Sequence, residues 1–200
     1  SLVLVPQGER GRALRDFPRL GGGRACNLEL RDVQLPADAL LGDGSDALPA
    51  IEATIDRAMA ALGAEAVGIM QTLLDQTLEY TKIRKQFGRP LSANQVIRHR
   101  LADMAMNCDE ARSMALRAAL MVDAEPVARS RAASGAKAKI GKCARFVAEQ
   151  SVQLHGAMGV TEELDIGSYF KRLLAFDTLF GGSAYHYRRH AALGGRTVQT

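Results

Sequence analysis

Residues 51–73 have the sequence IEATIDRAMAALGAEAVGIMQTL, and this stretch decides the fold class. Its apolar side chains recur every three or four residues, at Ile51, Ile55, Met59, Leu62, Ala66, Ile69 and Leu73. That spacing places them on one face of a helix. The pattern predicts a long amphipathic helix from about Ser45 to Lys82.

Helical patterns continue along the rest of the chain. A second helix is predicted to start with a capping box at Ser92–Gln95 and to end near Asp123. A third opens at Glu125-Pro126 and ends at the glycines 156 and 159. The last two are a fourth helix capped by Thr161-Glu162-Glu163 and reaching Phe180, and a fifth from Ser183 to about Gly194. Abundant alanines suit close helix packing, so the predicted fold is mainly α, an antiparallel four-helix-type bundle.

The first 45 residues have a different character. Strand-like alternation occurs in residues 2–5 and again in residues 27–33, among glycines and prolines. These strands are too few to close a sheet, and the chain begins at a serine inside one of them. We therefore expect residues 1–45 to be the end of a β domain with its linker, residues 46–200 to be the bundle, and the chain to be a fragment.

Composition excludes several protein classes. The 200 residues are 47% hydrophobic and 24% charged, which excludes disorder. No run approaches the roughly 18 apolar residues of a membrane span, and the N-terminus lacks signal-peptide features, so we expect a cytoplasmic protein with no membrane span. Cys26, Cys108 and Cys143 are too far apart for a CxxC pair, which predicts small buried hydrophobes and no metal site.

Charge is mixed along the chain, with a formal net charge of +4. The exception is the acid-free stretch between Glu125 and Glu149, whose basic residues are Arg129, Arg131, Lys137, Lys139, Lys142 and Arg145. A nucleic-acid patch would need stacking aromatics, and the stretch offers only Phe146. A solvated or anion-facing helix side is the favoured interpretation, and we expect no nucleic-acid partner.

Two short motifs each have a structural interpretation when they are taken alone. Residues 84–88, RKQFG, could be a charged helix end, with Arg84 opposite the helix dipole. Residues 153–159, QLHGAMG, could be a helix terminus with Gly156 as its C-cap. Each motif alone favours the structural interpretation.

In combination and in order, these motifs resemble the C-terminal half of the acyl-CoA dehydrogenases, flavoenzymes that desaturate an acyl-CoA thioester between its α and β carbons. The matching segments are 28–36 (LELRDVQLP), 40–42 (LLG), 80–91 (YTKIRKQFGRPL) with Gln95, 101–104 (LADM), 153–159 and 169–172 (YFKR). The resemblance implies that residues 1–45 are the last strands of a β-barrel domain with its linker. It also implies that the bundle binds FAD and forms the oligomer.

The resemblance assigns cofactor contacts residue by residue. It implies that Arg84, Gln86, Phe87, Asn94 and Gln95 contact FAD, much of it the flavin held by a neighbouring subunit. It places Gln153, Leu154, His155, Gly156 and Ala157 near the adenosine half, with Ala157 where a second glycine is usual. Ser183 and Tyr185 would line the flavin. A guanidinium such as that of Arg84 suits a pyrophosphate because it donates charge-assisted hydrogen bonds.

The chain differs from most members of the family at the catalytic base. In most members a glutamate follows the fourth helix, whereas Gly181 occupies that place here. Some relatives carry the base on the first bundle helix before an arginine, where this chain has Asp56-Arg57. Asp56 is therefore a candidate base or substrate contact, with Thr54 and Arg57 beside the thioester. The alternative is an ordinary surface aspartate.

The missing glutamate is similar to the situation in heteromeric acyl-CoA dehydrogenases, in which one subunit type carries the base. Residues 169–182 resemble the small-subunit type acting on dicarboxyl-CoA (pimeloyl-CoA-like) or steroid acyl-CoAs. The expected function is α,β-desaturation of an acyl-CoA by an FAD-dependent homo- or hetero-oligomer, with an electron-transfer flavoprotein as acceptor. The alternative is a non-catalytic structural or assembly subunit with the same fold.

Overall fold

The computed structural model describes residues 1–20, 22–161 and 163–195, and most of them are helical. The α-helices of this described part are α1 (Leu48–Ile83), α2 (Gln95–Leu120), α3 (Pro126–His155), α4 (Ile166–Thr178) and α5 (Ser183–Leu193). Short 3₁₀ turns occupy Ala37–Ala39, Leu91–Ala93 and Gly156–Val160. The predicted mainly helical bundle behind short N-terminal strands is confirmed.

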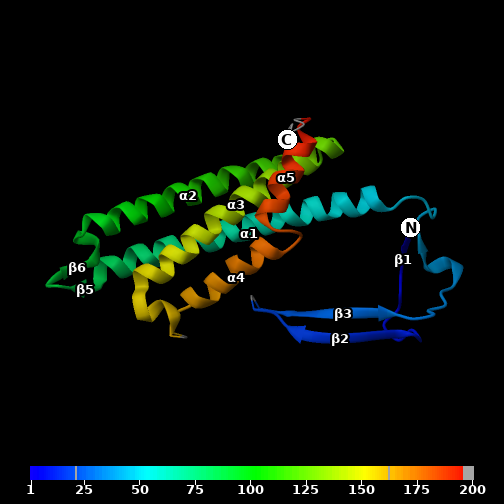
Figure 1. Cartoon of the computed structure of the whole chain (residues 1–200), viewed down its shortest axis with the longest axis horizontal. Coiled ribbons are helices and arrows are strands. Elements are labelled where there is room, and N and C mark those ends of the chain that lie inside the picture. The colour runs from blue at the N-terminus through cyan, green and yellow to red at the C-terminus, as the bar shows by residue number, and fades with distance from the viewer. Residues whose placement is uncertain (21, 162, 196–200) are drawn as a thin grey trace.

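The three long helices α1, α2 and α3 lie side by side, with α2 running antiparallel to both α1 and α3, and α3 is the central element (Figure 1). Helix α3 contacts α1, α2, α4 and α5. Alanine and glycine make this possible, because small side chains let neighbouring helices approach α3 on several sides. At Gly141 a Cβ would lie 2.6 Å from both Asp177 Oδ1 and Ser183 Oγ, so this glycine admits the turn between α4 and α5.

The hydrophobic core lies within the bundle. Its fully buried members include Met70, Leu73, Met104, Ile140 and Val147, contributed by α1, α2 and α3. Among the described residues, no residue of the N-terminal strands belongs to this buried core. The bundle therefore supplies the core of the described chain.

The N-terminal strands form two separate antiparallel pairs. Strand β1 (Leu2–Val3) pairs with β4 (Leu40–Leu41), and β2 (Arg12–Pro18) pairs with β3 (Arg24–Leu30). The sequence did not predict β2, because its apolar residues do not alternate regularly. The strand predicted at 27–33 begins earlier and ends at Leu30, before Asp32, whose φ is +51°.

Several predicted helix boundaries are wrong. Helix α2 ends at Leu120, not near Asp123, and α4 begins at Ile166, five residues after Thr161. The capping box at Ser92–Gln95 is not formed, since α2 starts after Asn94 with no side-chain cap bond. Glu162, part of the predicted cap of the fourth helix, lies outside the described residues, as do residues 196–200 of the predicted bundle domain.

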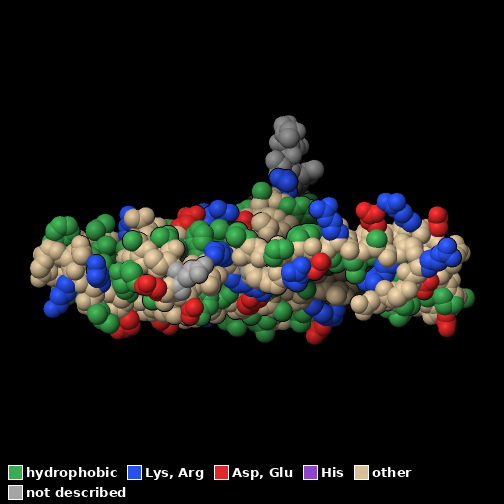
Figure 2. All heavy atoms as spheres, turned by 90° about the horizontal axis from the view of Figure 1, so that it is seen from below, with side chains coloured by type: hydrophobic (Ala, Val, Ile, Leu, Met, Phe, Trp, Pro, Cys, Tyr) green, Lys and Arg blue, Asp and Glu red, His purple; other side chains and the backbone are tan. Residues whose placement is uncertain are grey.

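The three cysteines differ in burial, and charge is mixed on the surface. Cys108 and Cys143 are buried as predicted, but Cys26 is exposed on β3, so that prediction is wrong for one of the three. On the face shown in Figure 2, basic and acidic side chains are interspersed among hydrophobic ones. No helix in the described part of the chain is long and apolar enough to cross a membrane.

Candidate functional site

The predicted site residues fall into two groups at opposite ends of the bundle. Asp56 and Arg84 lie near the two ends of α1, and 28 residues of helix at 1.5 Å each separate them by about 42 Å. We call residues 84–95 with 153–157 the open end, and residues 52–59, 129–137 and 177–189 the closed end. A dinucleotide bound at one end of this chain does not reach the other end.

A tight hairpin forms the tip of the open end. Strands β5 (Lys85–Gln86) and β6 (Arg89–Pro90) pair antiparallel around Phe87 and Gly88. Both turn residues have positive φ, +55° and +78°, as a type I′ turn requires. An aromatic residue rarely adopts this conformation, and here Phe87 is 97% exposed. The hairpin thus holds Phe87 out in solvent, away from the bundle.

Polar residues next to this hairpin are partly fixed. The Arg89 guanidinium donates to Asn94 Oδ1, and Asn94 Nδ2 donates to the Leu91 carbonyl at 3.1 Å. This pairing explains why the Asn94 side chain does not cap α2. Arg84 and Gln95 are exposed and lie at the same end of the bundle.

The end of α3 joins the open end through an aromatic contact. Tyr80 of α1 stacks on His155 with ring centroids 4.3 Å apart, and its hydroxyl donates to the His155 carbonyl at 3.3 Å. Burial lowers the pKa of His155. The side chains of Leu154 and His155 are buried, whereas Gln153 is exposed. The structure therefore brings the two predicted motifs to one end of the bundle.

The loop after α3 has the backbone that its glycines allow. Gly156 ends α3 with a φ of +61°, which confirms the predicted C-cap, and it is exposed. Ala157 is also exposed and has an ordinary negative φ, so the methyl group at this position causes no backbone strain. Two hollows flank this loop, one of about 610 Å³ beside α4 and one of about 400 Å³ beside Tyr80 and His155.

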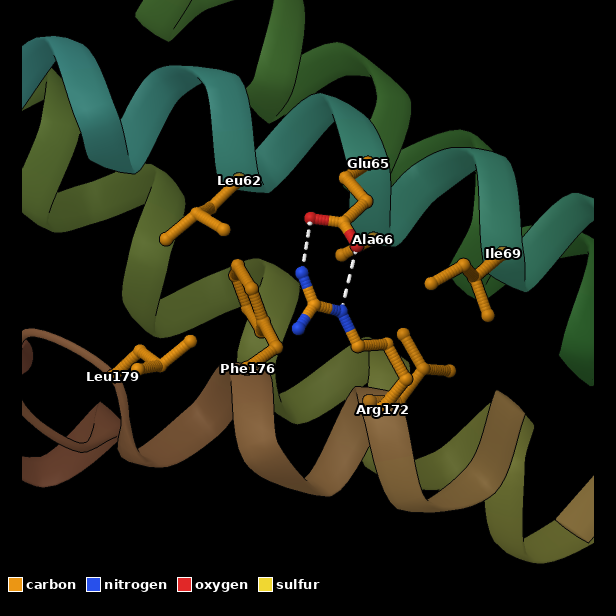
Figure 3. Close-up of a pocket in the computed structure, with 8 residues that line it drawn as sticks. Leu62, Glu65, Ala66, Ile69, Arg172, Phe176 and Leu179 are labelled. Carbon is orange, nitrogen blue, oxygen red and sulfur yellow. Dashed lines mark hydrogen bonds and ion pairs between the residues drawn. The ribbon is translucent and has the colours of Figure 1, made fainter. Parts of the chain in front are cut away.

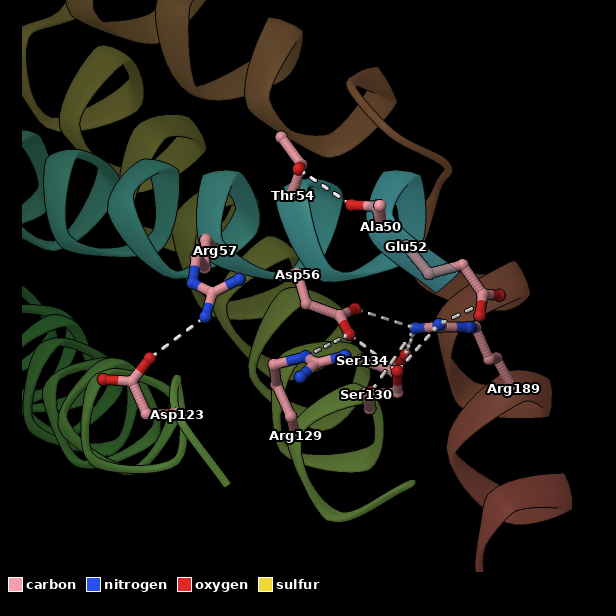
Figure 4. Close-up of polar contacts among 10 residues, drawn as sticks. All are labelled: Ala50, Glu52, Thr54, Asp56, Arg57, Asp123, Arg129, Ser130, Ser134 and Arg189. Atoms are coloured by element: carbon pink, nitrogen blue, oxygen red, sulfur yellow. Dashed lines mark hydrogen bonds and ion pairs between the residues drawn. The ribbon is translucent and has the colours of Figure 1, made fainter. Parts of the chain in front are cut away.

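A buried ionic network forms the closed end (Figure 4). Asp56 is 1% exposed. Its Oδ2 accepts from Ser130 Oγ at 2.6 Å and Arg129 Nε at 3.3 Å, and its Oδ1 accepts from Arg189 Nη1 at 3.3 Å. Arg189 also donates to Ser134 Oγ at 2.8 Å. The network joins α1, α3 and α5, and the surface interpretation of Asp56 is wrong.

The three residues predicted to lie beside a thioester do not come together. Figure 4 shows Thr54, Asp56 and Arg57 pointing to different sides of α1. Thr54 Oγ1 donates to the Ala50 carbonyl of its own helix at 2.8 Å, and Arg57 pairs with Asp123 at 3.1 Å on the surface. Both oxygens of Asp56 are engaged inside the bundle. The role of Asp56 as a base stays a prediction.

Sequence reasoning missed the buried lysine of the closed end. Lys137 is 1% exposed, and its ammonium donates to the carbonyls of Asp177 and Gly181 at 3.1 and 3.0 Å. It also lies 4.6 Å from the centre of the Phe176 ring. Burial lowers the pKa of Lys137. The expectation of a solvated or anion-facing helix side is therefore wrong for Lys137, whereas the buried Arg129 does face an anion, the carboxylate of Asp56. The signal for a buried polar face was the series 130–134–137 among alanines.

The turn at Gly181 leaves little room for a larger residue. Its φ is +104°, and a Cβ there would lie 2.8 Å from Tyr185 Cδ1 and 3.3 Å from His186 Nε2. Tyr185 is half exposed, whereas the hydroxyl of Ser183 is bonded to Asp177. The predicted place of the family's glutamate is therefore occupied by the side chains of α5.

A third region, between α1 and α4, is closed by packing and by an ion pair (Figure 3). The Arg172 guanidinium makes two contacts with Glu65, at 2.7 and 2.9 Å, over Leu62, Ile69 and Phe176. The cavity beneath measures about 10 Å³, which is at the lower limit for one water molecule. The described residues contain no cluster of three or more potential ligands for a metal ion.

Comparison with known families identifies the bundle. The family model described as "Acyl-CoA dehydrogenase, C-terminal domain" matches residues 48–192, from the first residue of α1 to the last but one of α5. The chain belongs to the acyl-CoA dehydrogenase family. The resemblance inferred from the motifs is thereby confirmed.

Individual acyl-CoA dehydrogenases give the same result. The chain is 37% identical to a probable acyl-CoA dehydrogenase, YngJ, of Bacillus subtilis over 83% of this chain and 44% of that protein. It is 32% identical to the human mitochondrial short-chain specific acyl-CoA dehydrogenase, over 86% of this chain and 42% of the relative. A solved structure, a variant of the Tcur3481-Tcur3483 steroid ACAD, is 31% identical and superposes with a TM-score of 0.83. The match covers 96% of this chain and 50% of that chain. The chain thus spans about half the length of these relatives.

Proposed function

We propose that this chain is the C-terminal portion of an FAD-dependent acyl-CoA dehydrogenase and acts as one subunit of a heteromeric enzyme. The observation that carries the proposal is the open end, where an exposed Phe87 stands on a type I′ turn beside exposed Arg84, Gln86 and Gln95. A strained, solvent-exposed aromatic residue is costly unless a ligand or partner covers it. Family membership supplies the cofactor class.

The residues of the open end fit the chemistry of FAD. Arg84 would hold the pyrophosphate, since a guanidinium donates two charge-assisted hydrogen bonds. Gln86, Gln95 and Gln153 offer amide groups to ring and ribose atoms, and Phe87 offers an aromatic face. Gly156 and Ala157 let the cofactor approach the backbone. When bound, FAD accepts the hydride from the substrate's β carbon.

A neighbouring subunit would hold part of the same cofactor. The open end is about 42 Å from the closed end, where Ser183 and Tyr185 were predicted to line a flavin. The two sets of residues therefore serve two different FAD molecules, and each FAD lies between subunits. This arrangement requires an oligomer formed through the bundle.

The heteromeric part of the proposal concerns the base. Gly181 carries no side chain, and Tyr185 fills the space where one would project. Both oxygens of Asp56 are already bonded within the bundle. A partner subunit that carries the carboxylate would remove the substrate's α-proton, while this chain positions FAD. We extend the proposal to a dicarboxyl- or steroid-type acyl-CoA as substrate, an electron-transfer flavoprotein as acceptor, and a cytoplasmic location.

The flavin content of the open-end variants tests the proposal. Arg84→Gln and Phe87→Ala are expected to lower the FAD retained per chain at least tenfold, because each removes a contact to the cofactor. Lys82→Ala, at an exposed neighbour paired with Glu79, is the matched control and should retain FAD. Full flavin content in both open-end variants would overturn the proposal.

Native mass spectrometry of the purified assembly tests the heteromer. One FAD per two chains, with a second acyl-CoA dehydrogenase-like subunit, is the expected result. A homo-oligomer with one FAD per chain would overturn the heteromer and leave Asp56 as the candidate base. A flavin-free assembly would instead favour the alternative, a structural subunit.

The Asp56→Asn variant separates the two assignments of the base. If a partner carries the base, flavin-loaded Asp56→Asn assemblies should turn over at nearly the normal rate. Loss of turnover with full flavin content and an unchanged melting temperature would instead assign the base to Asp56. The melting temperature is essential, because Asp56 also holds the buried network.

A further inference from the structure

A hollow beside the open end is left unassigned by the proposed function. Its volume is about 400 Å³, a size typical of sites for small molecules. Gln76, Glu79 and Tyr80, from the last turns of α1, form one part of its wall, and residues 163–166, which lead into α4, form another. His155, the last residue of α3, also lines it. The hollow therefore lies where α1, α3 and the start of α4 meet.

One ring nitrogen of His155 is available to a ligand. The residue is 5% exposed, and its Nδ1 lies 2.8 Å from the Ser151 carbonyl. A carbonyl can only accept, so Nδ1 carries the hydrogen and Nε2 presents a lone pair. Within the described part of the chain, Nε2 of His155 has no hydrogen-bond partner, yet the only buried side-chain nitrogen or oxygen without a partner there is Nδ1 of His186. Nε2 of His155 therefore reaches solvent at the hollow that this residue lines.

The charge around the hollow is negative. Glu79, Glu163 and Asp165 line it, and no lysine or arginine of the described chain does. Glu79 pairs with Lys82 at 2.7 Å, whereas no ion pair among the described residues involves Glu163 or Asp165, which are both exposed. A concave site lined by one sign of charge attracts the opposite sign. The hollow thus favours a cation and repels the phosphates of FAD, so a ligand here is distinct from the cofactor.

The fixed position of the imidazole narrows the kind of cation. Tyr80 stacks on the His155 ring with centroids 4.3 Å apart, which holds the direction of Nε2. Burial lowers the pKa of His155, so Nε2 remains an acceptor near pH 7. The residues that the structure describes offer no cluster of metal ligands, so the cation that fits is organic. A guanidinium suits the site, because its five N–H donors point in several directions and can serve an acceptor nitrogen and carboxylates together.

We infer that this hollow binds a guanidinium group, which donates a hydrogen bond to Nε2 of His155 and whose charge is balanced by Glu163 and Asp165. The group can come from two sources. One is a free guanidino compound, which is independent of the proposed function. The other is an arginine side chain of a neighbouring subunit, which rests on the oligomer of the proposed function.

Methylguanidinium and methylurea are the probes, because they share a planar shape and differ in charge. The full chain, labelled with ¹⁵N-histidine, is titrated with each. Methylguanidinium is expected to shift the Nε2 resonance of His155 and to bind about tenfold more tightly than methylurea, since charge-assisted hydrogen bonds are stronger than neutral ones. Equal affinities of the two probes, or no shift at His155, would overturn the inference.

Variants of the wall keep the test independent of folding. Glu163→Gln and Asp165→Asn remove one charge each at exposed positions, and the Asp165 side chain makes no cap bond to α4. Both should weaken the binding of methylguanidinium and leave that of methylurea unchanged. His155→Phe keeps a ring against Tyr80 but removes the acceptor, and should weaken it too. Glu149→Gln, at an exposed acid of α3 outside the hollow, is the matched control. Normal methylguanidinium affinity in both carboxylate variants would overturn the inference.

A final comparison distinguishes the two sources. Equilibrium dialysis measures methylguanidinium binding to the purified assembly and to the chain alone. Equal binding supports a free guanidino compound and overturns the arginine of a neighbouring subunit. Loss of binding in the assembly, together with easier dissociation of Glu163→Gln assemblies, supports the arginine and overturns the free compound. The titration of the chain alone needs neither flavin nor a partner, so failure of the proposed function would leave its result intact.

Discussion

The two ends of the bundle are built from similar residue types but use them differently. At the open end, Arg84 and Phe87 are exposed on a hairpin. At the closed end, Asp56 and Arg189 are turned inward and engage one another. Charged side chains that are already paired contribute to the fold, whereas exposed ones remain available to a ligand or partner. The contrast predicts that stability depends on the closed end and cofactor binding on the open end.

The largest expected effect comes from breaking the closed end. Asp56→Ala removes the carboxylate that joins the guanidinium groups of Arg129 and Arg189, which are mostly buried. Loss of one partner of a buried ion pair costs about 3–5 kcal/mol, because the remaining charges are left uncompensated. Urea denaturation of the chain measures this change.

The surface pair of Arg57 and Asp123 provides the matched control. Both side chains are more than half exposed, so Asp123→Ala should cost less than about 1 kcal/mol. If Asp56→Ala were no more destabilising than Asp123→Ala, the network would not hold α1, α3 and α5 together, and the contrast between the ends would fail.

Acid is expected to weaken both ends. Burial lowers the pKa of His155 at the open end and of His186 at the closed end. The unfolded chain therefore takes up protons before the folded chain does, so stability falls as the pH drops below the unfolded pKa of about 6.5 and towards the folded values. The free energy of unfolding changes by at most about 1.4 kcal/mol per pH unit for each histidine.

The variant His155→Phe sharpens this test. It keeps a ring against Tyr80 but cannot take up a proton. Denaturation curves recorded at several pH values between 7.5 and 5 should show a shallower loss of stability in His155→Phe than in the unmodified chain. Parallel slopes would show that the burial of His155 does not contribute to the acid sensitivity.

The smallest expected effect on stability is at the tip of the open end. Phe87→Gly removes an exposed ring and relieves a positive φ that glycine adopts easily. The free energy of unfolding should therefore rise by up to about 1 kcal/mol or remain unchanged. FAD content of the same variant should fall. A loss of more than 1 kcal/mol in the chain alone would mean that Phe87 supports the fold.

The sequence predicted the long helices well, because their signals are local. The periodic apolar residues placed α1 within a few residues, and Gly156 correctly ended α3. Strand β2 was missed because its residues show no regular alternation. The capping box failed because Leu91–Ala93 forms a 3₁₀ turn and α2 begins at Gln95, so Ser92 does not stand at the N-cap position.

The site was predictable only in part, for a related reason. Two motifs indicated the open end, and the structure shows that they meet through Tyr80 and His155. The closed end depends on pairs far apart in the sequence, such as Asp56 with Arg189. The inward direction of Lys137 likewise depends on the carbonyls of a distant turn. Periodicity identifies a helix face but does not identify the partner of a charge.

Helix α1 runs unbroken from one end of the bundle to the other, and this continuity links their orientations. Each residue of a helix turns the chain by about 100° and advances it by 1.5 Å. One residue inserted near the middle of α1 would therefore rotate Asp56 away from α3, or turn the Phe87 hairpin to another side of the molecule. An insertion of seven residues, close to two full turns, would nearly restore the angle while lengthening the bundle by about 10 Å. The single helix thus sets the rotational phase between the two ends as well as their separation.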